Sequence, residues 1–391
     1  MKNAHKRWGL GVSLLLLAGT ALASVTPPAA SAASQPPRAC GLPSRSGHIA
    51  GIVPAIGGQC PTNSAHQATS NTKAHNTSDP ASGTPPLIFH GGSMMMTPST
   101  GPLVVTPIFW NPSSFPMGSS YTSLISSYLS AVSSASGQNT NVFSVLNEYS
   151  GNNGQINYSV TLGTPVNDTH ALPRSGCTVA SRDKTRIYAD GSGYSACLDD
   201  AQLQTEINSV TAASGLPRNL SHIYVLYLPK HVESCFNPGS TTTSANACTI
   251  NYQPSAAYCA YHSETASSAV YASMPYPVYN SGTGFSCGSE SSFGVVESPN
   301  GNPDADVAIS PTSHEISEAI TDPDTSTGWY DSSGYEIGDE CAYIYGATQG
   351  TAGQLYNQVI NGLHFLTQEE FSNNDFAVTG GGCVQAAVDE A

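Results

Sequence analysis

Charged residues are scarce in this sequence, and basic residues are the scarcest of them. Asp, Glu, Lys and Arg make up 10% of the 391 residues, and 27 acidic residues stand against 12 Lys and Arg, for a net charge of −15. No Lys or Arg follows Lys230. Because nucleic-acid binding needs a basic surface, we expect no nucleic-acid partner.

Long hydrophobic runs are also scarce. The one apolar run, from about Gly9 to Leu22, follows a basic N-terminal stretch and is followed at once by Pro, Ser and Ala. This pattern is typical of a secretory signal and too short for a stable membrane span. We therefore predict a signal peptide over residues 1–23, with an alternative end near residue 32. The protein is expected to be secreted and extracellular, with no membrane association after cleavage.

The ten cysteines include no Cys-x-x-Cys pair, so the sequence indicates neither a thiol redox motif nor a cysteine-rich zinc site. In an oxidising compartment an even number of cysteines predicts a disulfide framework. Proximity in the chain suggests the pairs Cys177–Cys197 and Cys341–Cys383, and the other pairings stay open.

The signature of phosphate binding is missing, because the chain contains no phosphate-binding glycine loop. His222, His262 and His364 lie in strand-like stretches, and we predict structural roles for them. His90 precedes two glycines that would let the backbone approach a ligand, but a histidine bonded within a turn is the simpler interpretation.

Periodic apolar patterns begin only after a long segment rich in Pro, Ser and Thr. Residues 24–86 cannot bury enough apolar surface to offset the entropy of ordering, so we predict a flexible, propeptide-like leader. The later patterns predict strands at 103–110, 155–163, 222–229, 256–263 and 269–276, and helices at 120–135, 143–149 and 199–215. This order predicts one disulfide-stapled α+β domain over residues 87–391, with a central mixed sheet.

One short stretch of the chain carries a metal-binding pattern. Residues 311–323 read PTSHEISEAITDP and contain His-Glu-x-x-Glu, close to the His-Glu-x-x-His of zinc peptidases. Ser310 can cap a helix, Pro311 suits its first position and Pro323 ends it. We therefore predict a helix over about 311–321.

On such a helix His314 and Glu318 lie one turn apart on the same face, where both can bind one metal ion. Glu315 is next to them, at the place where a general base would activate a water molecule. The spacing thus predicts His314 and Glu318 as metal ligands and Glu315 as the catalytic residue.

The surroundings of this motif are strongly acidic. Between residues 304 and 340 there are ten carboxyl groups and no Lys or Arg: Asp304, Asp306, Glu315, Glu318, Asp322, Asp324, Asp331, Glu336, Asp339 and Glu340. If several converge on a buried site, their repulsion must be offset by a cation, by protonation or by a distant Arg. A divalent ion with His314 as one ligand is the simplest answer. We expect Asp322, Asp324 and Asp331 to point into water instead.

The third ligand is predicted to come from YEIGDECAY, which supplies Glu336 and Asp339 next to a cysteine that a disulfide can anchor. A different zinc-peptidase pattern would use Asp324, ten residues after His314. Zinc is the expected cofactor, although a site with one histidine and two acids also suits Mn or Ca.

Several blocks of the chain, in sequence order, resemble the EXORDIUM-like, or phosphate-induced, family of secreted proteins. They are IFHGGSMM at 88–95, IYVLYLPKHVESCF at 223–236, HEISEAITDP at 314–323 and YEIGDECAYIYG at 335–346. The resemblance implies secretion and a link to the cell wall, with His-Glu-x-x-Glu as the family's normal pattern. The residues that match that pattern are His314, Glu315, Glu318, Glu336, Asp339 and Cys341. The resemblance implies no particular activity.

Three functions are compatible with these observations. The first, which we favour, is a secreted zinc-dependent hydrolase, a peptidase of zincin-like architecture that acts on an extracellular protein or peptide. In it, the strand at 269–276 would bind an extended substrate by backbone pairing. The second is a non-catalytic EXORDIUM-like, cell-wall-associated protein with a structural metal site. The third is a metal-free carboxyl hydrolase that uses Glu315 and Glu336 at low pH.

Overall fold

The computed structural model describes most of the chain from residue 85 onward. The described residues are 85–177, 190–236, 258–280, 287–332 and 334–387, with the short pieces 42–43, 49–50, 52–54, 186–187, 248–249 and 284–285. The predicted signal peptide lies outside these residues, as do Cys40 and Cys60. Within the described part, no helix is both long and apolar enough to cross a membrane.

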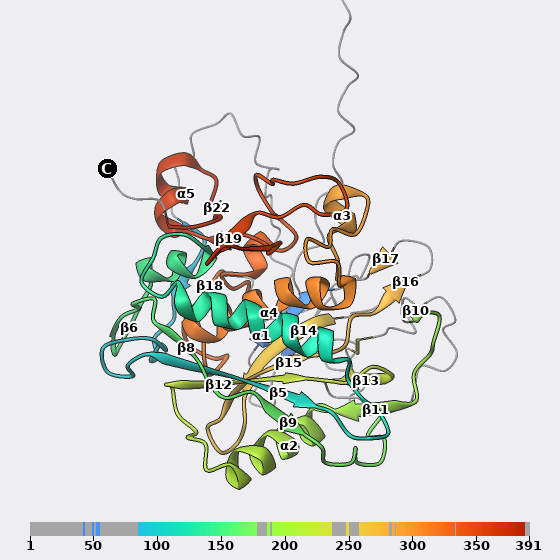
Figure 1. The fold of residues 1–391 in the computed structure, drawn as a ribbon. Helices are drawn as coiled ribbons and strands as arrows, with labels where there is room; N and C mark the ends of the chain where they lie inside the picture. Colours follow the sequence, from blue (N-terminus) through green and yellow to red (C-terminus); the bar gives the residue numbers. More distant parts are fainter. Residues whose placement is uncertain are drawn as a thin grey trace, which may run out of the picture. The chain divides into compact units, whose positions relative to one another are not determined.

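A mixed, seven-stranded sheet forms the centre of the fold (Figure 1). Its strand order is β3-β14-β15-β12-β5-β8, and β9 also pairs with β5. The strands are β3 (Ile52–Pro54), β5 (Leu103–Trp110), β8 (Val160–Leu162), β9 (Val166–Asp168), β12 (His222–Tyr227), β14 (Tyr258–Glu264) and β15 (Val270–Met274). Neighbours from β15 to β8 and β9 are parallel, whereas β14 is antiparallel to both β15 and β3. The predicted α+β class with a central mixed sheet is confirmed.

Helices cover both faces of this sheet. The helices α1 (Ser119–Ser134) and α4 (Pro303–Thr321) lie on one face, and α2 (Asp200–Ala213) lies on the other (Figure 1). The start of α2 is fixed by a capping box, in which Asp199 accepts from the Gln202 N–H and the Gln202 side chain accepts from the Asp199 N–H.

The two faces of β5 show why the sheet is buried on both sides. Val105 and Phe109 pack into the apolar cluster that also holds the inner faces of α1 and α4. Ile108 and Trp110 belong to the cluster under α2. Because successive side chains of a strand alternate between faces, an almost continuously apolar strand such as this one belongs inside a three-layer arrangement.

Shorter elements complete the described part of the chain. They are β1 (Leu42–Pro43), β2 (Ile49–Ala50), β4 (Ile88–Phe89), η1 (Val142–Glu148), β6 (Ser150–Gly151), β7 (Gly154–Gln155), β10 (Arg186–Ile187), β11 (Ala196–Asp199), β13 (Val232–Cys235), β16 (Tyr279–Asn280), β17 (Gly284–Phe285), α3 (Glu290–Phe293), β18 (Trp329–Tyr330), η2 (Asp339–Cys341), β19 (Gln358–Ile360), β20 (Leu363–Phe365), β21 (Glu370–Phe371), α5 (Asn373–Thr379) and β22 (Cys383–Val384). The helix predicted at 143–149 is thus a 3₁₀ helix, and the strand predicted at 155–163 is reduced to two short pieces.

The edge of the sheet differs from the prediction. Residues 269–276 form β15, whose two sides pair with β12 and β14, so this strand has no free edge for a peptide substrate. The outer side of β14 pairs with β3, where Ile52 is opposite Tyr261. Since β3 lies within residues 24–86, the sheet includes a strand from the segment predicted to be a flexible leader, before the boundary at residue 87.

The motif helix α4 is longer than predicted. It begins at Pro303 after an Asn302 cap and runs through Pro311, which we had expected at its first position. The pair Asn302-Pro303 is itself a start signal, and it precedes the one at Ser310. The Ser310 hydroxyl does not cap the helix but accepts a hydrogen bond from the Gln368 N–H (3.0 Å).

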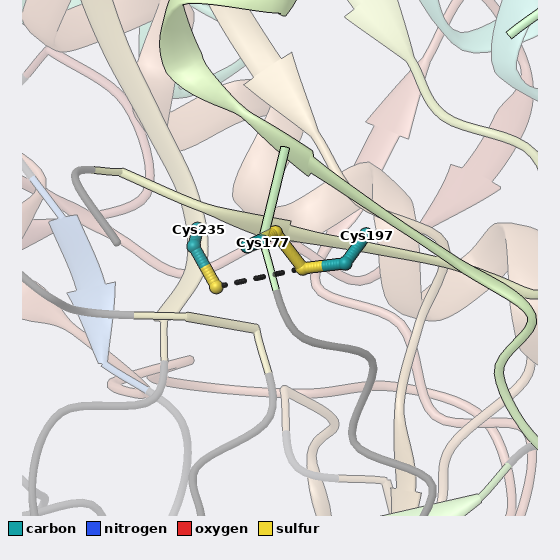
Figure 2. Close-up of side chains that lie close together, drawn as sticks. All are labelled: Cys177, Cys197 and Cys235. Carbon is teal, nitrogen blue, oxygen red and sulfur yellow. Dashed lines mark hydrogen bonds between the residues drawn. A yellow bond between two sulfur atoms is a disulfide. The ribbon is translucent and has the colours of Figure 1, made fainter. Parts of the chain in front are cut away.

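Four disulfides staple the described residues: Cys177–Cys197, Cys235–Cys248, Cys259–Cys287 and Cys341–Cys383. The two pairs predicted from proximity are confirmed. Cys235 Sγ lies 3.7 Å from Cys197 Sγ, so two of the bridges are in contact beside the parallel pair β11 and β13 (Figure 2). The bridge at Cys341 closes the segment that follows α4.

Candidate metal centre

Separate elements place histidine and carboxyl side chains in one buried cluster. They are His314, Glu315 and Glu318 from α4, His262 from β14, Glu336 from the loop before η2, and Asp339 from the first position of η2. Their fractional exposure is between 0% and 5%. The structure therefore brings together the predicted base and all the residues that the sequence favours as ligands.

His314 and Glu318 face each other one turn apart on α4, as their spacing predicts. His314 Nε2 lies 2.8 Å from Glu318 Oε1. Nevertheless, Nε2 has no hydrogen-bond partner, because the two atoms are not aligned for a hydrogen bond. Donor atoms that converge in this way without bonding to each other are arranged like ligands of a shared ion.

The segment 336–341, which includes η2, presents two acids to this helix. Asp339 Oδ1 lies 3.5 Å from His314 Nε2. The Asp339 N–H donates to Glu318 Oε1 (3.1 Å), and the Glu336 N–H donates to Asp339 Oδ2 (3.1 Å). Because the Cys341–Cys383 disulfide anchors the end of this segment, Asp339 is held in the position of a third ligand.

Close packing fixes the ring of His314. A Cβ atom at Gly338 would lie 2.6 Å from His314 Nδ1, so that only glycine fits beside the ring. Gln368 Nε2 lies 2.7 Å from His314 Nδ1 and donates to the carbonyl oxygen of Gly338 (2.7 Å). Both neighbours hold the opposite ring nitrogen toward Glu318 and Asp339.

His262 is a member of the cluster that the sequence did not reveal. We predicted a structural role for it, but its Nδ1 lies 3.3 Å from Glu315 Oε2 and 3.5 Å from Glu318 Oε2. Its Nε2 lies 3.0 Å from the carbonyl oxygen of Asp322 and 3.7 Å from Glu336 Oε1. A histidine within a fully buried strand needs a polar partner. This need is the one signal in the sequence that could have placed His262 in a shared site.

The structure also corrects the prediction for Asp322, which is 1% exposed instead of pointing into water. Asp324, the alternative third ligand, is turned away into a loop. There its Oδ1 accepts hydrogen bonds from the backbone N–H groups of Ser326 and Thr327 (both 2.9 Å). This bonding fits a turn-forming aspartate and not a metal ligand.

The remaining histidines that the sequence singled out lie away from the cluster. His90 is exposed, stacks on Tyr330 at 3.7 Å between ring centroids, and its Nε2 lies 3.2 Å from the Tyr330 carbonyl oxygen. His222 Nδ1 lies 2.9 Å from the Ser221 hydroxyl oxygen, and His364 stacks on Tyr356. These contacts are those of structural residues.

Burial and mutual repulsion shift the protonation of the carboxyl groups. Burial, reinforced by the charge of Glu318, raises the pKa of Glu336 and of Asp339 well above the usual range. Burial likewise raises the pKa of Glu315 to about 7. For Glu318 burial acts in the same direction, but the two nearby histidines outweigh it and lower its pKa to about 2.

The histidines shift in the complementary sense. Burial opposes the protonation of His262, but the carboxylates of Glu315 and Glu318 outweigh it and raise the pKa of the ring to about 10. The same balance raises the pKa of His314 well above its usual value. Without another cation, the cluster therefore has to retain protons.

The unsatisfied groups of this cluster fit a divalent cation. Six buried carboxyl groups surround the histidines, namely Glu315, Glu318, Asp322, Glu336, Asp339 and Glu370. Of the described residues, only His262 and His314 form ion pairs with them. His314 Nε2, Asp339 Oδ1 and both carboxylate oxygens of Glu336 have no hydrogen-bond partner. Buried donor atoms without partners are costly unless an ion or protons satisfy them.

The cluster is closed to solvent, but a surface hollow lies next to it. This hollow of about 540 Å³ is lined by Gly92, Ser93, Glu264, Pro323 and Asp324, among others. Pro323 and Asp324 directly follow Asp322 of the cluster, and Glu264 lies two residues beyond His262 on the same face of β14.

Comparisons with protein-family models, with curated proteins and with solved structures find no match to this chain. The resemblance to the EXORDIUM-like family therefore stays a prediction from the sequence.

Proposed function

We propose that this chain is a secreted, metal-dependent hydrolase whose metal ion is bound by His314, Glu318 and Asp339. The proposal rests on one observation above all: buried donor atoms of these residues, of which His314 Nε2 and Asp339 Oδ1 have no hydrogen-bond partner, converge from α4 and from the anchored segment 336–341. One imidazole and two carboxylates suit zinc, the ion that we expect, and also manganese. The arrangement of a His-Glu-x-x-Glu helix under a mixed sheet supports a zincin-like site.

Glu315 is the proposed general base. It follows His314 directly on α4, and its Oε1 has no hydrogen-bond partner, while His262 Nδ1 contacts its other oxygen. A carboxyl group with a pKa of about 7 is suited to accept a proton near neutral pH. A bound divalent ion would polarise a substrate carbonyl group and lower the pKa of a nearby water molecule.

A peptide or protein is the proposed substrate, and the hollow beside Asp322 is the proposed entry. An extended peptide can pair with a sheet only at an edge strand, and on this side of the sheet the edge strand is β3, which pairs with β14. A substrate that pairs with β14 therefore has to displace β3.

A second candidate is a non-catalytic extracellular protein in which the same metal ion is structural. The complete burial of Glu315 favours this function, because a catalytic base has to meet its substrate. The ion would then hold α4, β14 and the segment 336–341 together. Such a role is compatible with the resemblance to the EXORDIUM-like family.

Metal analysis combined with a peptidase assay separates these functions. The wild type, His314→Ala and Glu315→Gln would be tested for bound metal and for hydrolysis of an unfolded protein, with and without a chelator. Glu369→Gln, at another buried acid, serves as the matched control. The hydrolase proposal predicts that His314→Ala binds less metal than the wild type, and that the wild type has chelator-sensitive activity that Glu315→Gln lowers by about 10²–10⁴-fold.

Other results would decide against the hydrolase. Bound metal without activity, together with a well-folded Glu315→Gln variant, would support the structural role. Absence of metal from wild type and variants would rule out both proposals. Activity that peaks at low pH and ignores the chelator would support a carboxyl hydrolase based on Glu315 and Glu336.

A further inference from the structure

Two sets of potential ligands share the side chain of Glu318. One set is His314, Glu318 and Asp339, and the other is His262, Glu318 and Glu336. In each set, one donor atom from every residue lies within 4.8 Å of the other two. All five residues are buried.

The two oxygens of Glu318 face different histidines. Its Oε1 lies 2.8 Å from His314 Nε2, and its Oε2 lies 3.5 Å from His262 Nδ1. A carboxylate that presents one oxygen to each of two imidazole rings is arranged as a bridge. In two-metal sites the ions are about 3.5–4 Å apart, a distance that a bridging carboxylate spans.

The proton of His262 is placed for metal binding through Nδ1. Its Nε2 lies 3.0 Å from the carbonyl oxygen of Asp322, and a carbonyl oxygen can only accept a hydrogen bond. The neutral ring therefore carries its proton on Nε2 and leaves the Nδ1 lone pair toward Glu315 and Glu318. A hydrogen bond from the non-ligating nitrogen to a carbonyl oxygen is the usual support of a metal-binding histidine.

One ion at His314 would leave Glu336 unexplained. Its side chain is 1% exposed, and neither of its carboxylate oxygens has a hydrogen-bond partner. Of the described residues, only His262 forms an ion pair with it, at 3.7 Å from Nε2. The burial of this carboxyl group has to be offset by a proton or by a cation, and a cation bound beside His262 would offset it.

We propose that the centre is dinuclear, with Glu318 bridging a first ion at His314 and Asp339 and a second ion at His262 and Glu336. This inference rests on the proposed metal centre and extends it. The second ion is a divalent cation that accepts nitrogen and carboxylate ligands, such as Zn²⁺ or Mn²⁺.

The test counts ions bound by the full-length protein. Metal-free protein is titrated with Zn²⁺, and bound zinc per chain is measured by mass spectrometry after removal of excess. We expect two ions in the wild type, one in Glu336→Gln and in His262→Ala, one in His314→Ala, and a loss of both high-affinity sites in Glu318→Gln. His222→Ala, at a histidine outside the cluster, should retain two.

Glu336→Gln keeps the shape of the side chain, so it remains informative if His262→Ala does not fold. A second readout uses Mn²⁺, whose electron paramagnetic resonance spectrum shows exchange coupling between neighbouring ions in the wild type. That coupling should disappear in Glu336→Gln, which should show an isolated Mn²⁺ signal instead. One ion in the wild type that Glu336→Gln leaves in place would overturn the dinuclear proposal but keep the first site. No bound ion in the wild type would overturn both.

Discussion

His262 Nδ1 lies 3.3 Å from Glu315 Oε2, although the two residues belong to a sheet strand and to the helix packed on it. The other nitrogen of the same ring lies 3.0 Å from the carbonyl oxygen of Asp322, directly after that helix. One imidazole ring thus ties β14 to the C-terminal half of α4. A substitution of His262 would change both the packing of α4 on β14 and the set of metal ligands. Substitutions of residues that only hold the ligands in place therefore test metal binding more directly.

Gly338→Ala should displace the ring of His314. Gly338 has φ −78° and ψ −36°, which alanine adopts without strain, so the substitution isolates the contact with the ring. The added Cβ would lie 2.6 Å from His314 Nδ1. Overpacking of this kind costs about 1–3 kcal/mol of stability. We expect a lower melting temperature and weaker zinc binding, measured by thermal unfolding and by competition with a chromophoric chelator.

Gly381→Ala is the matched control for that substitution, because the nearest atom to its added Cβ is 3.9 Å away. The control should bind zinc like the wild type. Zinc binding that is unchanged in Gly338→Ala as well would show that His314 does not ligate the ion.

Gln368 should control metal affinity through the protonation of His314. If His314 binds metal through its Nε2, its ring proton has to be on Nδ1, and Gln368 then has to turn its amide oxygen toward that proton. In the structure it is instead the Gln368 Nε2 that lies 2.7 Å from His314 Nδ1. Gln368→Met cannot accept that proton's hydrogen bond and should weaken zinc binding by about 10–100-fold. Gln368→Glu always presents an oxygen, although it loses the hydrogen bond to the Gly338 carbonyl oxygen, and it should bind zinc more tightly than Gln368→Met. Equal affinities for both variants would contradict this role.

Removal of the Cys341–Cys383 bridge should weaken metal binding as well as stability. The bridge closes a loop with a sequence separation of 42 residues and ends two residues after Asp339. By chain entropy it contributes about 4 kcal/mol to stability. The double substitution Cys341→Ser and Cys383→Ser should lower the melting temperature and the zinc affinity together.

The corresponding double serine variant of Cys177 and Cys197 is the control for that experiment. This pair closes a loop with a sequence separation of 20 and lies at β11, outside the cluster. It should lower the melting temperature but leave zinc affinity unchanged. If both double variants lose zinc equally, anchoring of Asp339 is not the cause.

Local sequence patterns predicted the helices and strands better than they predicted the residues of the metal centre. The apolar run of β5 and the capped start of α2 are features of contiguous residues, so their elements could be located from the sequence. His314 and Glu318 share one helix, and the helical repeat alone places them together. His262 joins them across the contact between β14 and α4, which no local pattern encodes.

The outer edge of the sheet shows the same limit. The pairing of β3 with β14 is a contact between two strands that are far apart in the sequence, and β3 is short. The Pro- and Ser-rich composition around β3 is typical of a segment without ordered structure. The strand predicted at 269–276 is present as β15, but its predicted pairing with a substrate fails for a related reason. Propensity identifies a strand, but its position within the sheet depends on partners far away in the chain.

Glu369 should make the stability of the protein depend on pH. Burial, reinforced by Asp375, raises the pKa of this carboxyl group to about 7 from an ordinary value of 4.5. Since the folded protein favours the protonated form, the stability that this form contributes is fully present below pH 4.5 and is lost as the pH rises through about 7. With solvent screening taken into account, we expect a loss of about 1–2 kcal/mol from this group.

Glu369→Gln cannot ionise, so the difference between its free energy of unfolding and that of the wild type should grow in favour of the variant from pH 4.5 to pH 8. Urea unfolding at several pH values measures this, and a difference that stays constant over that range would show that Glu369 titrates alike in the folded and unfolded chains.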